Sequence, residues 1–83
     1  MLFYVYILHS VLADQYYIGS TENLSDRLFR HNNSGSKSTR KVCDWELKYS
    51  VSFQTRALAV QEEKRIKAKK SRKYIEMLIS SAG

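Results

Sequence analysis

The sequence predicts a small α+β domain in which a three-stranded antiparallel sheet is flanked by helices, in the order β-β-α-β-α-α. Residues 2–8, 16–20 and 45–53 are rich in β-branched and aromatic residues, as strands are. Residues 24–32, 56–70 and 72–79 carry apolar residues at helical spacing, and each stretch follows a residue suited to cap a helix. With 83 residues the chain has room for one domain, so we expect a single unit over residues 1–83.

The first predicted strand, LFYVYIL at residues 2–8, is apolar on both of its alternating faces. We therefore expect helices on both sides of it. If it pairs antiparallel with YYIGS, a register that sets Tyr6 opposite Tyr17 also sets Tyr4 opposite Gly19. The phenols of Tyr6 and Tyr17 then share one face of the sheet, and Gly19 leaves room beside the bulky side chain of Tyr4.

The third strand, WELKYSVSF at residues 45–53, alternates along its length. This alternation predicts that four apolar side chains lie on one face of the sheet: Trp45, Leu47, Tyr49 and Val51.

Each predicted helix has a start signal. Asn23 is expected to cap the first helix, with Asp26 completing a capping box, and Arg27 and His31 lie four residues apart beside its leucine stripe. Thr55 is a suitable cap for residues 56–70. Ser71 suits residues 72–79, although no proline or glycine separates the last two helices and one continuous helix is the alternative.

Charge and cysteine content limit the classes of function. Fourteen Lys and Arg against eight Asp and Glu leave a net charge of +6, which favours a polyanionic partner such as nucleic acid. The single cysteine, Cys43, fits a reducing cytoplasm and is expected to be a small buried apolar residue. The apolar first segment is too short to span a bilayer and lacks the features of a signal peptide, so no membrane association is expected.

A carboxylate on the apolar stripe of the second predicted helix, residues 56–70, is a candidate for chemistry. Glu63 has Ala59 and Ile66 beside it on a helical wheel, and a carboxylate there needs a cation or a metal as partner. Glu62 lies between Leu58 and Ile66, so the wheel alone leaves the choice between the two glutamates open.

Five residues together carry the groups that phosphodiester hydrolysis needs. It requires a base for water, a cation against the developing charge and, usually, a divalent metal. One carboxylate can hold one Mg²⁺ when water and phosphate oxygens complete its shell. The candidates are Tyr6, Tyr17, Arg27, His31 and Glu63.

The ordered series of motifs resembles the GIY-YIG nuclease superfamily, which includes homing endonucleases and the amino-terminal nuclease domain of an excinuclease. Tyr4-Val5-Tyr6 and Tyr17-Ile18-Gly19 resemble its paired motif, and LSDRLFRHN resembles the helix that carries its arginine and histidine. The likeness continues through WELKYSVSF and TRALAVQEEKRIKAKKSRK, so it covers nearly the whole chain. It is closest to the small members that consist of this domain alone.

The resemblance implies a role for each candidate. Tyr17 would be the general base, with Tyr6 positioning water and phosphate. Arg27 would stabilise the phosphate, His31 would assist proton transfer or contact the phosphate, and Glu63, rather than Glu62, would bind a single Mg²⁺ or Mn²⁺.

Two departures from the family pattern leave these groups in place. Tyr4 stands where the name-giving glycine lies, and VCDWEL lacks the proline expected before the third strand. Homing endonucleases and the excinuclease carry separate DNA-recognition domains, and we expect none in this chain. Its nucleic-acid contacts are therefore expected to be mainly with the backbone, from Arg30, Lys37, Arg40, Lys41, Lys67 and Lys73.

The function expected is a cytoplasmic, metal-dependent DNA endonuclease with weak sequence specificity, acting in repair or recombination. The alternative is a non-catalytic DNA- or RNA-binding or adaptor domain that keeps the fold. A protein that gains specificity or activity from a protein partner is a third hypothesis. Binding alone would not need the carboxylate, which favours the enzyme.

Overall fold

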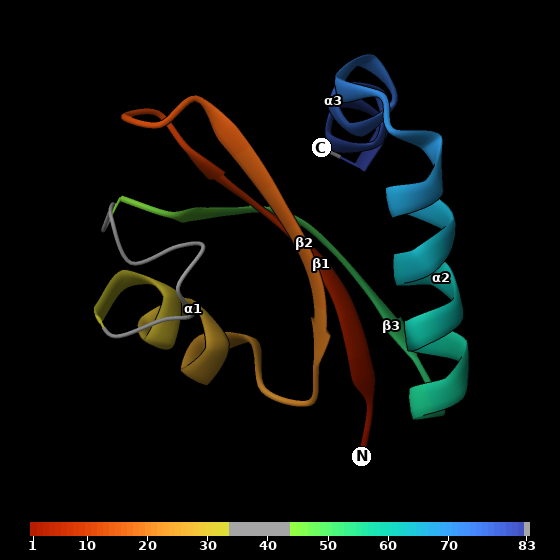
Figure 1. Cartoon of the computed structure of the whole chain (residues 1–83). Helices are drawn as coiled ribbons and strands as arrows, with labels where there is room; N and C mark the ends of the chain where they lie inside the picture. Colours follow the sequence, from red (N-terminus) through yellow and green to blue (C-terminus); the bar gives the residue numbers. More distant parts are fainter. Residues whose placement is uncertain (34–43, 83) are drawn as a thin grey trace.

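The computed structural model describes residues 1–33 and 44–82 and contains the six expected elements in the expected order (Figure 1). β1 pairs antiparallel with both other strands, so the strand order is β2-β1-β3. The predicted α+β class and the order β-β-α-β-α-α are confirmed. The elements are β1 (Phe3–Ser10), β2 (Gln15–Thr21), α1 (Leu24–Asn33), β3 (Glu46–Phe53), α2 (Arg56–Lys69) and α3 (Arg72–Ala82).

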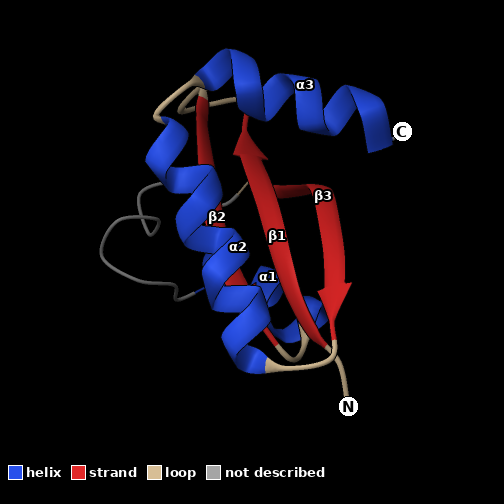
Figure 2. Cartoon of the chain, turned by 90° about the vertical axis from the view of Figure 1, so that its right-hand side faces the viewer, coloured by secondary structure: helices blue, strands red, loops and turns tan. Residues whose placement is uncertain are grey.

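Helices cover both faces of the sheet. In Figure 1, α1 lies on one side of the strands and α2 and α3 lie on the other. Figure 2 shows α2 running along the sheet while α3 lies across one end of it. The central strand β1 is therefore enclosed, with Val5 and Ile7 0% exposed and Tyr6 and Leu8 1% exposed. The expectation that this strand is covered on both faces is confirmed.

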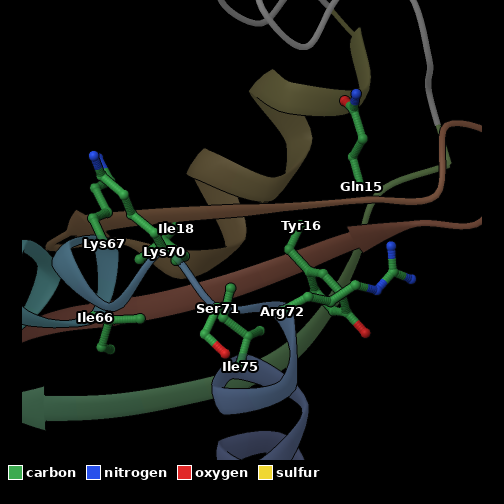
Figure 3. Close-up of a pocket in the computed structure, with 9 residues that line it drawn as sticks. All are labelled: Gln15, Tyr16, Ile18, Ile66, Lys67, Lys70, Ser71, Arg72 and Ile75. Atoms are coloured by element: carbon green, nitrogen blue, oxygen red, sulfur yellow. The ribbon is translucent and has the colours of Figure 1, made fainter.

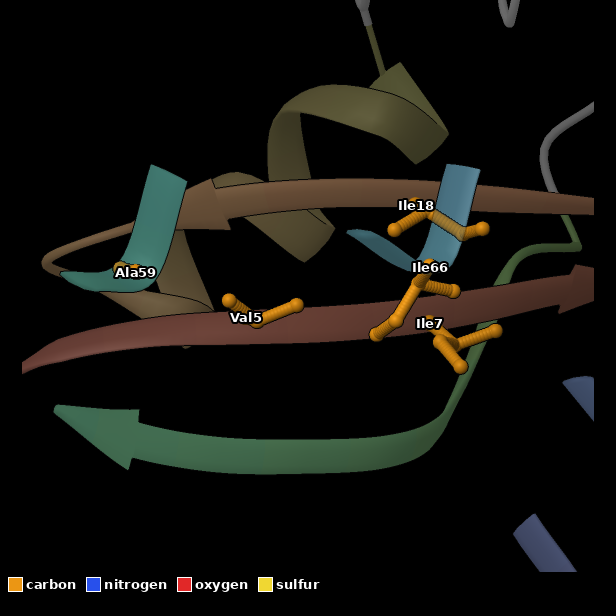
Figure 4. Close-up of a cluster of buried hydrophobic side chains, with 5 residues drawn as sticks. All are labelled: Val5, Ile7, Ile18, Ala59 and Ile66. Carbon is orange, nitrogen blue, oxygen red and sulfur yellow. The ribbon is translucent and has the colours of Figure 1, made fainter. Parts of the chain in front are cut away.

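The core consists of two apolar clusters, one on each face of β1. The cluster under α2 and α3 joins strand and helix residues, as Figure 4 shows: Val5, Ile7, Ile18, Ala59 and Ile66. The cluster under α1 is more aromatic. Tyr6, Leu8 and Trp45 form it, and Tyr17, Leu24 and Leu28 pack against them.

The register of β1 against β2 differs from the expected one by two residues. Tyr6 pairs with Gly19, and Leu8 pairs with Tyr17. A shift of two residues keeps every side chain on its expected face, so both phenols still share the α1 side of the sheet. A Cβ on Gly19 would lie 2.5 Å from the Tyr6 Oη atom, so the glycine does leave room for a bulky neighbour. That neighbour is Tyr6 rather than Tyr4.

The expectation that four apolar residues of β3 share one face is wrong. Ile7 pairs with Tyr49 whereas Leu8 pairs with Leu47, so Lys48 is an extra residue in β3. A bulge of one residue reverses the alternation of side chains beyond it. Trp45 consequently joins the cluster under α1, while Tyr49 and Val51, together with Phe53, pack on the cluster under α2 and α3.

The last two helices are separate. Lys70 ends α2 in the left-handed conformation, with φ at 48°, and its N–H donates to the Lys67 carbonyl. Thr55 caps α2 by accepting from the Leu58 N–H at 3.2 Å, and Ser71 accepts from the Tyr74 N–H at 3.1 Å. The caps expected for both helices are confirmed, and the single continuous helix is excluded.

Half of the expected capping box on α1 is present. The Asn23 side chain accepts from the Asp26 N–H at 3.0 Å, as expected of a cap. The reciprocal bond is made by another residue, because the Asn23 N–H donates to Thr21 Oγ1 at 3.1 Å. Asp26 instead pairs with Arg30 at 3.2 Å. No helix within residues 1–33 and 44–82 has both the length and the apolar character needed to cross a membrane.

The contact between Tyr6 and Gly19 leads to a first prediction. Gly19→Ala puts a methyl group 2.5 Å from Tyr6 Oη and 2.7 Å from Tyr6 Cζ, and a rigid ring in a packed core cannot yield cheaply. We expect the free energy of unfolding, measured by urea denaturation, to fall by about 1–3 kcal/mol. In a Tyr6→Leu background, which lacks these ring atoms, the same change should cost much less. An equal cost in both backgrounds would contradict the steric explanation.

Candidate active site

The candidate residues of the first two strands meet at one edge of the sheet. β2 is an edge strand, and the Tyr6 ring extends from β1 across β2 over Gly19, where a side chain would block it. Arg27 and His31 come from α1, which covers the same face of the sheet. The phenol of the central strand is thus brought toward the open edge of the sheet.

Glu63 approaches this edge from the other face. It lies on α2, and its Oε1 atom accepts a hydrogen bond from Ser20 Oγ on β2 at 2.8 Å. Its Oε2 atom accepts from Lys67 Nζ at 2.7 Å. Gly19 and Ser20 are neighbours on the edge strand. The Tyr6 ring contacts the first and the Glu63 carboxylate the second, so the two groups lie near one another on either side of β2.

Four aromatic rings pack together beneath α1. The Oη atom of Tyr6 lies 3.3 Å from Nε2 of His31. The centroid of the Tyr17 ring is 4.4 Å from that of His31 and 6.4 Å from that of Tyr6. Trp45 closes the group, with its ring centroid 6.4 Å from Tyr17 and 6.3 Å from His31.

Asn32 fixes the position of Trp45. Its side-chain amide donates to the Trp45 carbonyl at 3.1 Å and accepts from the Trp45 N–H at 2.8 Å. These two bonds join the last turn of α1 to the residue that precedes β3. They hold His31, the neighbour of Asn32, against the aromatic group.

Burial changes the acidity of two members of this group. Tyr6 is almost fully buried, and removal from water raises its pKa to about 12, although the nearby positive charge of Arg27 acts in the opposite direction. Burial also lowers the pKa of His31 below its usual 6.5, and the charge of Arg27 lowers it further. At neutral pH, Tyr6 is therefore a neutral phenol and His31 a neutral imidazole.

Arg27 supplies the positive charge of the group. Its charge is felt by both Tyr6 and His31, which places the guanidinium beside both. Its buried Nε atom has no hydrogen-bond partner within the described part of the chain. The Arg27 side chain as a whole is half-buried, so its charge can attract an oxyanion such as a phosphate to this edge.

The two glutamates left open by the helical wheel have different surroundings. Glu62 is held within α2 by Arg65, which donates to both of its carboxylate oxygens at 2.7 and 2.6 Å. Glu63 reaches out of its helix to β2, and its charge contributes to raising the pKa of Tyr6, after the effects of burial and of Tyr17. Glu63 is therefore the glutamate that shares a site with the tyrosines.

The donor groups fit a hard divalent cation only in part. Within residues 1–33 and 44–82, no three His, Cys, Asp or Glu residues lie close enough to enclose a metal ion. Mg²⁺ does not need such a cage, because one carboxylate with water and phosphate oxygens can complete its shell. Glu63 can serve as that carboxylate if the ammonium group of Lys67 moves away from the Oε2 atom of Glu63.

The residues expected to contact nucleic acid are dispersed. Arg30 is exposed on α1 and pairs with Asp26, Lys67 pairs with Glu63, and Lys73 is exposed in the first turn of α3. Lys37, Arg40, Lys41 and Cys43 lie outside the described residues.

Ser20, Asn32 and Trp45 were not among the residues expected in the site. A signal for Ser20 exists in the sequence: it follows Tyr16 and Ile18 in the alternation of β2, so a hydroxyl interrupts an otherwise apolar row. Trp45 and Asn32 carry no such local signal, because their roles depend on contacts across the sheet and between α1 and β3.

Comparisons with known proteins agree with this geometry. A family model described as the GIY-YIG catalytic domain matches residues 2–75. The solution NMR structure of a UPF0213 protein from Bacillus halodurans is similar, with 31% sequence identity and a TM-score of 0.63. That match covers 100% of this chain and 87% of the other. A search of curated proteins gave no significant match.

The family match spans most of the chain, from β1 into α3, and includes all five candidate residues. The chain therefore belongs to the GIY-YIG catalytic domain family, a family of nucleases that act on DNA and generally use divalent metal ions.

Proposed function

We propose that this protein is a metal-dependent endonuclease that hydrolyses DNA phosphodiester bonds with weak sequence specificity. The observation that carries the proposal is the meeting of Tyr6, Tyr17, Arg27 and His31 with Glu63 at one edge of the sheet. These groups supply a base, a cation and a metal ligand, which are the components of phosphodiester hydrolysis.

Tyr17 is the residue best suited to take a proton from the attacking water. It is half-buried, so water can reach it, whereas Tyr6 is 1% exposed and has its pKa raised to about 12. A phenol whose pKa is raised by burial is a poor source of phenolate at neutral pH. Tyr6, which stays protonated, instead donates a hydrogen bond and orients the groups around it.

His31 is suited to accept a proton from the reacting groups. Burial and Arg27 keep its pKa below 6.5, so it is neutral at pH 7, and its Nε2 atom lies 3.3 Å from the Tyr6 hydroxyl, a contact through which it can assist proton transfer. Its ring lies 4.4 Å from that of Tyr17, centroid to centroid. Arg27, whose charge lies beside Tyr6 and His31, is suited to stabilise the phosphate as negative charge develops.

Glu63 would hold the divalent ion, Mg²⁺ or Mn²⁺, with water and phosphate oxygens completing the coordination. The bound ion supplies positive charge opposite the developing negative charge of the phosphate. Ser20 keeps the carboxylate turned toward the edge of the sheet by donating to Oε1. The ring of Tyr6 passes over Gly19, the residue next to Ser20 on the same strand.

The proposed cellular setting rests on composition and on the family resemblance. The chain carries a net charge of +6, which favours contacts with the DNA backbone over the reading of bases, and its single cysteine fits the cytoplasm. A role in DNA repair or recombination, where a protein partner could add specificity, follows from the resemblance to the nuclease domain of an excinuclease.

Glu63→Gln should abolish metal-dependent cleavage because the amide removes the negative charge that holds the ion. We expect the rate of nicking of supercoiled plasmid with Mg²⁺ or Mn²⁺ to fall by about 10²-fold or more. Glu62→Gln is the matched control, since Glu62 is bonded to Arg65 on the same helix. Equal rates for wild type and Glu63→Gln would refute the proposed function, and DNA binding without cleavage in the wild type would indicate a binding domain.

Tyr17→Phe should remove the base while leaving the ring in place. The single-turnover cleavage rate should fall by about 10²–10⁴-fold, the usual contribution of a general base. Tyr16→Phe is the control on the neighbouring residue, whose hydroxyl bonds to Glu76 outside the site. A larger loss for Tyr16→Phe than for Tyr17→Phe would contradict the assignment.

The cleavage rate should fall as the pH is lowered below 6.5. His31 has a depressed pKa in the folded protein, so it stays neutral below 6.5 and is protonated only as the pH approaches that lower value. The unfolded chain takes up the proton first, so the free energy of unfolding also falls in this range. Single-turnover rates and Tm values from pH 5 to 8 separate the two effects. His9→Gln, at the chain's other histidine, should leave the rate profile unchanged.

A further inference from the structure

A hollow of about 380 Å³ lies beside the candidate active site (Figure 3). The edge strand β2, the end of α2 and the start of α3 form its walls. Its apolar surface comes from Ile18, Ile66 and Ile75, and three cationic side chains line it: Lys67, Lys70 and Arg72.

These three cations differ in how their charges are neutralised. Arg72 donates to Asp14 and Glu76 and lies over the Tyr16 ring, so it is bound to the protein itself. Lys67 pairs with Glu63 at 2.7 Å. Lys70 is exposed, and within residues 1–33 and 44–82 its side chain has no hydrogen-bond or ion-pair partner.

Lys67 and Lys70 both line the hollow. Figure 3 draws them at the same end of it. Like charges that line one hollow attract an anion to it. The carboxylate of Glu63 compensates the charge of Lys67 and leaves the charge of Lys70 uncompensated within the described residues.

The backbone of Lys70 is in an unfavourable conformation. Its φ of 48° is in the left-handed region, where a helix end normally has glycine because a Cβ is strained there. A residue that is costly for the fold and has no partner within the described part of the protein is a candidate for binding something outside it.

We propose that Lys67 and Lys70 form a subsite for a backbone phosphate of DNA, next to the phosphate that is cleaved. The subsite rests on the proposed function, because it takes the same strand that Glu63 helps to cut. Lys67 is part of the new subsite and, through its hydrogen bond to Glu63, also of the proposed cleavage site. Lys70 belongs to the new one alone, so it is the residue to test.

The helix dipole offers another reason for a lysine at this position, because cations near a helix C-terminus are favourable. Lys69 is the matched control. It is in the last turn of the same helix and is exposed to the same dipole, but its Nζ atom lies 5.5 Å from the centre of the Tyr74 ring rather than beside Lys67.

The test compares Lys70→Gln, Lys70→Gly and Lys69→Gln for binding to a fluorescent DNA duplex of about 20 base pairs in EDTA, where no cleavage occurs. Both Lys70 variants should bind about 3- to 10-fold more weakly near 0.1 M salt, and the slope of log K against log salt should decrease by about 0.9, the value for one phosphate contact. Lys69→Gln should bind as tightly as the wild type to within about twofold.

Thermal unfolding supplies the second measurement. Lys70→Gly should raise Tm by several degrees, on the order of 4 °C, because glycine relieves the strain at this position. Weaker binding by a more stable protein cannot be attributed to partial unfolding. Unchanged binding by both Lys70 variants, or an equal loss in Lys69→Gln, would overturn the subsite and leave the nuclease intact. A wild type that does not bind the duplex in EDTA would overturn the subsite, and one that also fails to nick plasmid with Mg²⁺ or Mn²⁺ would overturn the nuclease as well.

Discussion

The site depends on the passage of the Tyr6 ring across β2 at Gly19. Tyr6 lies on the central strand, where helices cover both faces, and only a residue without a side chain on the neighbouring strand leaves space for its ring. This contact sets Tyr6 opposite Gly19 and brings a buried phenol to the edge of the sheet. The burial that results raises the pKa of Tyr6 to about 12 and keeps it protonated at neutral pH.

The fold could be predicted from the sequence where the information is local. The alternation of β1 shows two apolar faces whatever its partners, and Thr55 and Ser71 act within one turn of their own helices. Register and bulge are not local. A shift of two residues between β1 and β2 keeps all faces unchanged, so only the contact of Tyr6 with Gly19 distinguishes the alternatives. The sequence does not indicate the bulge at Lys48, because apolar and polar residues alternate regularly from Trp45 to Val51. In the structure Trp45 nevertheless packs in the cluster under α1 and Val51 on the cluster under α2 and α3.

The same distinction applies to the site. The types of residue and their order could be recognised in the sequence, but the choice between Glu62 and Glu63 needed more than a helical wheel. It depends on partners: Arg65 holds Glu62 within α2, whereas Ser20 binds Glu63 from another element 43 residues away in the chain. The supporting contacts of Asn32 with Trp45 join α1 to β3 and have no counterpart in any local pattern.

Lys67 couples the proposed binding of a metal ion at Glu63 to the proposed binding of a DNA phosphate. Its ammonium group and a divalent ion would use the same Oε2 atom of Glu63, so the carboxylate cannot hold both there at full strength. If Glu63 held a divalent ion, Lys67 would be free to contact a phosphate, and a phosphate on Lys67 would leave the carboxylate free for the ion. Binding free energies linked in this way are reciprocal, so each ligand would strengthen the binding of the other. Where Glu63 is the carboxylate that the described residues bring to the site, such coupling would restrict tight metal binding to the complex with substrate.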